Sequence, residues 1–214
     1  MGFGIYDIYR MFQPKFRQQR FKLFLDMFKP TDQTKILDVG GTVYDWAGCS
    51  SLASRVTVVN VAQAGLPPKT HPCFAYVVGD GRNLPFADQS FDIVYSNSVI
   101  EHLGSYVNQA EFAAELLRVG RGVFVETPNR WFPIEPHFVT VFFHYLPKRL
   151  QRFFLPHFSL RAIFRSGDNV TPMQLLEELR LLSFKEMKLL FPGCTIHRER
   201  LLGLTKSLIA IRQL

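Results

Sequence analysis

The chain has 214 residues, an apolar content of 47% and a formal net charge of +7. This length and apolar content are typical of one globular α/β domain with a substantial buried core. No apolar stretch approaches the roughly 20 residues that span a bilayer, and no cleavable leader pattern opens the chain. We therefore expect a soluble protein, or one attached at most to a membrane surface.

The three cysteines, Cys49, Cys73 and Cys194, lie far apart in the sequence. This spacing provides neither a disulfide framework nor a pair of metal-binding CxxC motifs. Unpaired cysteines are typical of the reducing cytosol, so we expect a cytoplasmic protein.

Basic residues are concentrated in two stretches that are also rich in phenylalanine. Residues 1–29 carry six basic side chains against two acidic ones, and residues 130–165 carry six against Glu135 alone. Surfaces of this kind attract nucleic acid, anionic lipid or a phosphorylated substrate. The alternative is a solvated basic exterior over an aromatic core.

The N-terminal stretch Ile5–Phe28 has apolar residues at steps of three and four, which predicts an amphipathic helix. Pro14 is expected to break or kink this helix, and Pro30 to end it. We interpret residues 1–30 as an N-terminal helical extension of the domain.

Short apolar runs then alternate with helical segments. A run of β-branched and aromatic residues bounded by turn residues predicts a strand, and strands this apolar predict a parallel sheet covered on both faces. A helix is predicted over Val99–Val119. The five predicted strands are Lys35–Val39, Val56–Asn60, Ala75–Val78, Phe91–Tyr95 and Gly122–Glu126.

The segment from Trp131 to Arg165 interrupts this rhythm, because it is aromatic, basic and rich in proline. We interpret residues 130–170 as a lid or insertion with one or two short helices. The alternation then resumes with a helix over Met173–Leu182, capped by Thr171-Pro172, and with two strands over Phe184–Leu190 and Ser207–Arg212.

These elements predict a single domain over residues 1–214. Right-handed crossovers between parallel strands give a doubly wound, mostly parallel seven-stranded sheet of Rossmann-like α/β class with helices on both faces. Ligands of such sheets bind beyond the carboxyl ends of the strands. Small and polar residues follow all five of the first strands: Asp38-Val-Gly40-Gly41-Thr42, Asn60, Asp80-Gly81, Ser96-Asn97-Ser98 and Thr127-Pro128-Asn129.

Three stretches, taken together, resemble a known family. They read ILDVGG, GDGRNLPFADQSFDIVYSNSVIEHL and RVGRGVFVETPN. They are similar to the class I S-adenosylmethionine-dependent methyltransferases related to ubiquinone- and biotin-pathway enzymes, which act on small molecules. The resemblance covers roughly residues 35–129, and the middle stretch is its most specific part.

The resemblance implies S-adenosylmethionine as the cofactor. Gly40 lets the backbone approach the cofactor where a Cβ atom would collide. By resemblance, Asp80 accepts a hydrogen bond from the adenine amino group, Leu84 helps to wall the purine, and Ser96 and Asn97 lie near the methionine end. The other implied cofactor-binding residues are Asp38, Gly41, Thr42, Asn60 and Gly81.

Two positions depart from the family pattern. Thr42 and Tyr44 stand where the family has glycines, and Asn60 stands where an acidic residue binds both ribose hydroxyls. An amide accepts one hydrogen bond and donates another, but it lacks the strength of a carboxylate. We expect a variant loop conformation; the alternatives are a low cofactor affinity or another ligand.

Methyl transfer depends mainly on holding a nucleophile in line with the sulfonium methyl group, sometimes with the help of a base. Glu101 and His102 follow the fourth strand, and His137 lies just past the fifth, where this fold places acceptor-binding groups. His102 and His137 are the candidate catalytic residues, since each can accept a proton near neutral pH. The alternative for His102 is a structural helix position, and Glu135 is expected at a helix start or in a salt bridge.

No metal is expected, because the remaining histidines have no ligand-like spacing. These are His71, His144, His157 and His197.

The predicted function is methyl transfer from S-adenosylmethionine to a small or lipid-linked acceptor, with contact to an anionic membrane through the lid. One alternative is an RNA or protein methyltransferase. Ser96-Asn97-Ser98-Val99 stands where such enzymes carry an Asn-Pro-Pro-Tyr-like stretch, and no RNA-binding module is appended, so nucleic acid is not an expected partner. The other alternative is a protein that keeps the fold and has lost catalysis.

Overall fold

The computed structural model describes residues 5–42, 46, 52, 55–61, 75–135, 137, 138, 140–158 and 171–214. Side chains are described from residue 15 onward, except those of residues 156–158. The predictions for Tyr44, Cys49, His71, Cys73, the His157 side chain and part of the lid lie outside the described residues.

The described residues form a seven-stranded sheet in the order β3-β2-β1-β4-β5-β9-β8. The first five of these strands are parallel, and β9 runs antiparallel to both of its neighbours. The predicted mostly parallel sheet is therefore confirmed. The strands are β1 (Ile36–Val39), β2 (Val56–Asn60), β3 (Ala75–Val78), β4 (Phe91–Asn97), β5 (Gly120–Pro128), β8 (Thr195–Leu201) and β9 (Leu204–Arg212).

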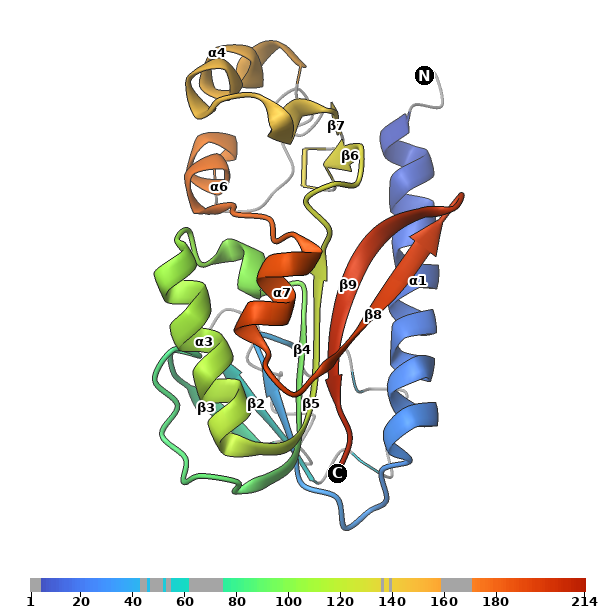
Figure 1. Cartoon of the computed structure of the whole chain (residues 1–214), viewed down its shortest axis with the longest axis vertical. Coiled ribbons are helices and arrows are strands. Elements are labelled where there is room, and N and C mark those ends of the chain that lie inside the picture. Colours follow the sequence, from blue (N-terminus) through green and yellow to red (C-terminus); the bar gives the residue numbers. More distant parts are fainter. Residues whose placement is uncertain are drawn as a thin grey trace.

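Helices cover both faces of this sheet (Figure 1). Helix α1 (Ile5–Phe28) packs on one face, and helices α3 (Tyr106–Val119) and α7 (Phe184–Leu190) pack on the other. Successive side chains of a strand point to opposite faces, so Ile36 joins the cluster under α1 and Leu37 the cluster under α3. Both faces of the central strands β1, β4 and β5 are buried, which explains their continuous apolar runs in the sequence.

Helix α1 is held by an aromatic cluster around Phe24. The Phe24 ring is fully buried and lies 5.9 Å from Trp46, 5.2 Å from Tyr95 and 5.6 Å from Phe124, all in edge-on geometry. The helix continues from Ile5 to Phe28 through Pro14, so the break expected there does not occur. Proline removes one backbone hydrogen bond of the helix. Further along the helix, Phe21, Phe24 and Phe28 pack against the sheet.

The structure corrects three predictions, two of them in the C-terminal part of the chain. Phe184–Leu190 was expected as a strand and is helix α7, because Ser183 and Glu186 form a capping box at its start. Strand β8 at Thr195–Leu201 was missed, and the predicted strand Ser207–Arg212 is part of β9. The predicted helix Val99–Val119 is divided into a 3-10 turn, η2 (Ile100–His102), and α3.

The segment after β5 lies beyond the carboxyl ends of the parallel strands (Figure 1). It contains a small hairpin of β6 (Ile134–Glu135) and β7 (Thr140–Val141), the turn η3 (Phe143–Tyr145) and helix α4 (Lys148–Phe158). These elements share a core of their own with helix α6 (Pro172–Glu178). The core residues are Phe138, Phe143, Leu155, Leu175, Leu176, Leu179 and Leu181.

Replacing Phe24 by alanine should lower the free energy of unfolding by about 3–5 kcal/mol, because the cavity would open inside a buried aromatic cluster. The exposed neighbour Lys22 provides the control, and Lys22→Ala should change stability by less than about 0.5 kcal/mol. Urea denaturation followed by circular dichroism measures both. A loss below about 1 kcal/mol for Phe24→Ala would contradict the packing of α1 on the sheet.

Candidate active site

The chain leaves β1 through a turn that only glycine fits. Gly40 has a φ of +82°, and a Cβ atom there would lie 2.5 Å from Cγ2 of Val99. The Gly40 N–H donates to the carbonyl of Val59 at 2.7 Å, which fixes the turn against β2. A Cβ atom on Gly41 would lie 1.9 Å from Oδ2 of Asp38. The chain itself therefore requires both glycines.

Asp38 in β1 contacts the loop that follows the glycine turn. Its side chain is buried, and Oδ2 accepts a hydrogen bond of 2.7 Å from the indole Nε1 of Trp46, which is also buried. Sequence reasoning did not find Trp46. A buried indole N–H needs an acceptor, but no pattern in the sequence connects it to Asp38.

Asn60 links the end of β2 to the glycine turn. Its Nδ2 donates to the carbonyls of Gly40 at 3.5 Å and Gly41 at 3.4 Å, and its Oδ1 accepts from the Val61 N–H at 2.9 Å. A carboxylate could not donate to the two carbonyls. The amide at this position is therefore matched to the loop in this structure.

Asp80 lies next to Asn60, because the Gly79 N–H donates to the Asn60 carbonyl at 3.0 Å. Arg82 holds both carboxylate oxygens of Asp80 with Nε and Nη2, and its backbone N–H also donates to Oδ1. The Arg82 guanidinium keeps the pKa of the Asp80 carboxyl below its usual value. The Asp80 side chain stays 39% exposed, so a ligand can reach it.

The other predicted cofactor residues lie deeper or face elsewhere. Leu84 is only 3% exposed and belongs to the core under α3. A Cβ atom on Gly81 would lie 2.5 Å from the ring of Phe112, so this glycine allows α3 to pack closely. Ser96 is buried and donates to the Val39 carbonyl at 2.9 Å. Asn97 faces α1, where its Oδ1 accepts from Arg20 at 3.0 Å.

The structure therefore gathers Gly40, Gly41, Asn60 and Asp80 at one edge of the sheet, with Thr42 following in the chain. Arg20 is a further residue that sequence reasoning missed. Its guanidinium pairs with Glu126 and with Glu199 at 2.9 Å each, and so ties α1 to strands β5 and β8.

Glu101 in η2 is a fully buried carboxyl group. Burial raises its pKa to about 7, against the opposing attraction of His137. Oε2 accepts a hydrogen bond of 3.0 Å from the hydroxyl of Thr127. Oε1 has no hydrogen-bond partner among the described residues and lies 3.9 Å from Nε2 of His137.

His137 is oriented by a second buried carboxyl group, that of Glu135. The distance from His137 Nδ1 to Glu135 Oε1 is 2.7 Å, and Glu135 Oε2 accepts the Phe138 N–H at 2.6 Å. Burial alone would raise the pKa of Glu135, but His137 and these hydrogen bonds bring it below its usual value. Glu135 is thus the salt-bridge residue that the sequence predicted.

The two candidate catalytic histidines lie side by side. The rings of His102 and His137 have centroids 4.8 Å apart and planes at 90°. Both are partly exposed, whereas Glu101 beside them is buried. The fold brings together residues of η2 and of the lid segment that are far apart in the sequence.

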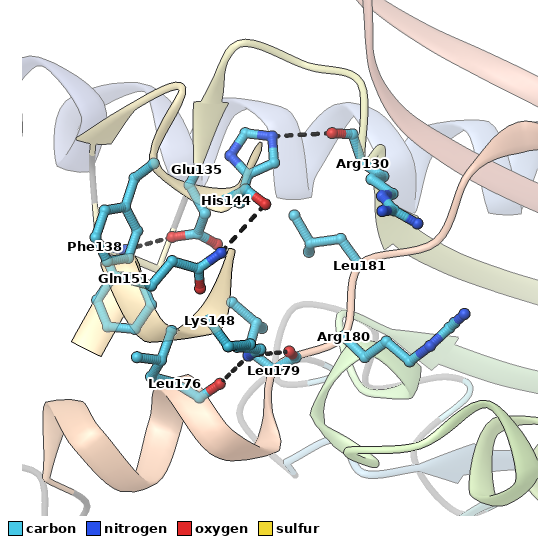
Figure 2. Close-up of a pocket in the computed structure, with 11 residues that line it drawn as sticks. Arg130, Glu135, Phe138, His144, Lys148, Gln151, Leu176, Leu179, Arg180 and Leu181 are labelled. Carbon is cyan, nitrogen blue, oxygen red and sulfur yellow. Dashed lines mark hydrogen bonds between the residues drawn. The ribbon is translucent and has the colours of Figure 1, made fainter. Parts of the chain in front are cut away.

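A pocket of about 200 Å³ adjoins the group formed by Glu101, His102 and His137 (Figure 2). Glu135 and Arg180 line the pocket and also contact the group, because the Arg180 N–H donates to the Glu101 carbonyl at 2.8 Å. Figure 2 shows Gln151 and His144 closing one side, with Gln151 donating to the His144 carbonyl. Lys148 lines the other side and donates to the carbonyls of Leu176 and Leu179. The wall combines leucine side chains with three basic ones, Arg130, Lys148 and Arg180.

Known proteins resemble this chain in part of its sequence and in its fold. A family model described as "Methyltransferase domain" matches residues 37–123. The chain is 32% identical over 100 residues to the biotin biosynthesis bifunctional protein BioHC of Cellvibrio japonicus. That match covers 45% of this chain, and the chain spans only 20% of that relative's length.

Solved structures share the fold over almost the whole chain. A protein from Pyrococcus horikoshii matches with a TM-score of 0.58 at 17% identity, and a SAM-dependent methyltransferase from Aquifex aeolicus with 0.54 at 12%. Each match covers 98% of both chains. At these identities the two structures show the fold alone, and the likeness to a methyltransferase family rests on residues 37–123. Residues 37–123 are thus similar to a methyltransferase domain family, and the described fold is similar to that of the two solved structures.

Proposed function

We propose that this protein transfers a methyl group from S-adenosylmethionine to a small or lipid-linked acceptor. One observation carries the proposal. Val99 lies against Gly40 of the glycine turn, and the next three residues form η2 with Glu101 and His102. The proposed cofactor site and the group around His137 therefore meet at one short segment of the chain.

The residues at the end of the sheet fit the cofactor in some respects. The turn at Gly40 and Gly41 leaves backbone partly exposed beyond buried strands, and Asp80 offers a carboxylate that is reachable from solvent. A carboxylate there would accept a hydrogen bond from the adenine amino group after Arg82 releases one of the two carboxylate oxygens. Asn60 fits less well, since both ends of its amide are bonded within the chain.

S-adenosylmethionine, when bound, supplies a methyl group that is already activated by its sulfonium. The protein therefore has to place the acceptor and exclude water. His102 and His137 are positioned to contact the nucleophilic group of an acceptor. Glu135 and Thr127 act as positioning residues, because they hold His137 and Glu101 through hydrogen bonds.

The pocket beside this group favours an acceptor of modest size with an anionic part. Arg130 lines the pocket and lies 5.6 Å over the ring of Trp131. Arg180 is partly neutralised by Glu186, so Arg130 is the stronger attraction for an anion at the pocket.

A lipid-linked acceptor is supported by the exposed aromatic surface of the lid. Trp131, Phe142 and Tyr145 are exposed and lie in ring contact, and Leu150 and Phe153 are exposed on α4. The basic surface is smaller than the sequence suggested, since Lys148 is bonded to carbonyls of α6 and Arg152 pairs with Glu177. Among the helices that the structure describes, none is long and apolar enough to cross a bilayer.

The adenine site is tested by a matched pair of variants. Asp80→Ala should weaken S-adenosylmethionine binding by about 1–3 kcal/mol, because it removes a charged acceptor. Arg82→Ala removes the ion pair but keeps the acceptor, so its affinity should equal or exceed that of the parent. Isothermal titration calorimetry measures both. If Arg82→Ala weakens binding as much as Asp80→Ala, the loop needs the ion pair and Asp80 does not bind the adenine.

Methyl transfer itself is tested by incubating the protein with methyl-labelled S-adenosylmethionine and extracts divided into aqueous and lipid fractions. We expect label in an anionic small molecule or a lipid-linked one. His137→Ala should lower the transfer at least about tenfold without changing cofactor affinity, since a positioned general base commonly contributes about 10²–10⁴-fold in rate. His197→Ala, on the exposed strand β8, should transfer normally. Label found only in protein or RNA would contradict the proposal.

A further inference from the structure

We infer that Glu101, His102 and His137 form a binding site for one divalent metal ion of the zinc type. One ligand atom from each residue lies within 4.8 Å of the others. This combination of two imidazoles and one carboxylate is a set that zinc and neighbouring transition metals use at sites with an open position. The sequence singled out these three residues near the acceptor but predicted no metal, because the spacing of the residues along the chain does not show that the fold brings them together.

The distances suit closure around an ion. Ligands that bind zinc at about 2.0–2.2 Å in a tetrahedral arrangement lie about 3.3 Å from each other. Glu101 Oε1 and His137 Nε2 are 3.9 Å apart, so a small rotation of either side chain brings both into range. The histidines are partly exposed, which gives an ion a path to the buried carboxylate.

The buried carboxylate supplies an independent argument. Glu101 Oε1 is buried and accepts no hydrogen bond within the part of the chain that the structure describes. An unsatisfied buried oxygen is costly, and a buried charge is normally paired or coordinated. This oxygen points to the space shared with His137, where a cation would satisfy it.

The surroundings of the ligands match those of protein metal sites. A histidine that binds a metal usually donates its other ring N–H to a carboxylate, which fixes the ring and its tautomer. Glu135 Oε1 lies 2.7 Å from His137 Nδ1 and can accept this bond, so that Nε2, on the side of Glu101, is the ring nitrogen that would bind an ion. Thr127 fixes Glu101 in the same way through Oε2.

Three protein ligands leave at least one coordination position for water or another oxygen. If the proposed function holds, an oxygen of the methyl acceptor could take this position. The metal would then orient the acceptor beside the glycine turn, because η2 joins Val99 to both ligands from this segment. Metal binding itself does not depend on methyl transfer.

The test uses the full chain after treatment with a chelator and dialysis. Zinc chloride is titrated in a calorimeter, and cobalt chloride is followed by visible absorption, which reports the ligands directly. We expect one ion per chain, with binding at least about tenfold weaker in Glu101→Gln and His137→Gln. Glu135→Gln, which keeps all three ligands, should weaken binding about 10–100-fold. His197→Gln is the matched control and should bind as the parent does.

Circular dichroism identifies any ligand variant that fails to fold. In that case His102→Gln, which changes a partly exposed ligand, replaces the unfolded variant in the titration. Binding no tighter in the parent than in the ligand variants overturns the inference. A titration with S-adenosylmethionine on the same protein separates the two proposals. Cofactor binding without zinc binding refutes the metal site alone, and zinc binding without cofactor binding refutes the proposed function alone.

Discussion

The hydrogen bond from the Gly40 N–H to the Val59 carbonyl, 2.7 Å long, fixes where the chain leaves the middle of the sheet. The turn it closes needs a positive φ and has no room for a side chain beside Val99 and Asp38. Asn60 bonds to the same turn from β2, and the Gly79 N–H bonds to Asn60 from the β3 side. The carboxyl ends of β1, β2 and β3 are thus joined through one glycine turn.

The short segment η2 joins this edge to the lid. Val99 packs against the turn, Glu101 is buried beside Thr127 of β5, and His102 contacts His137 of the lid. Two buried carboxyl groups at this junction would be unfavourable alone. Glu135 is stabilised by His137 and a backbone N–H, whereas Glu101 keeps a raised pKa and one unsatisfied oxygen within the described structure. Neighbouring acids whose pKa values are shifted in opposite directions are typical of a functional site.

The first five strands, the seven-stranded sheet and the glycine turn could be predicted from the sequence, because buried parallel strands leave clear apolar runs. The strand predicted over Phe184–Leu190 was wrong, because a short apolar run fits either a strand or a helix. The capping box of Ser183 and Glu186, which indicates a helix, was overlooked. The hydrogen bonds of Asn60 depend on carbonyl directions that no pattern encodes. The contact of His102 with His137 depends on how the lid folds back, and proline-rich segments reveal little of that path.

We propose that the cofactor and acceptor sites meet at η2, and a crystal structure with bound S-adenosylhomocysteine is the most direct test. We expect electron density for the ligand across the turn at Gly40, with the adenine at Asp80 and the sulfur toward the side of His102 and His137. Density for the ligand elsewhere on the protein, or an adenine far from Asp80, would contradict it.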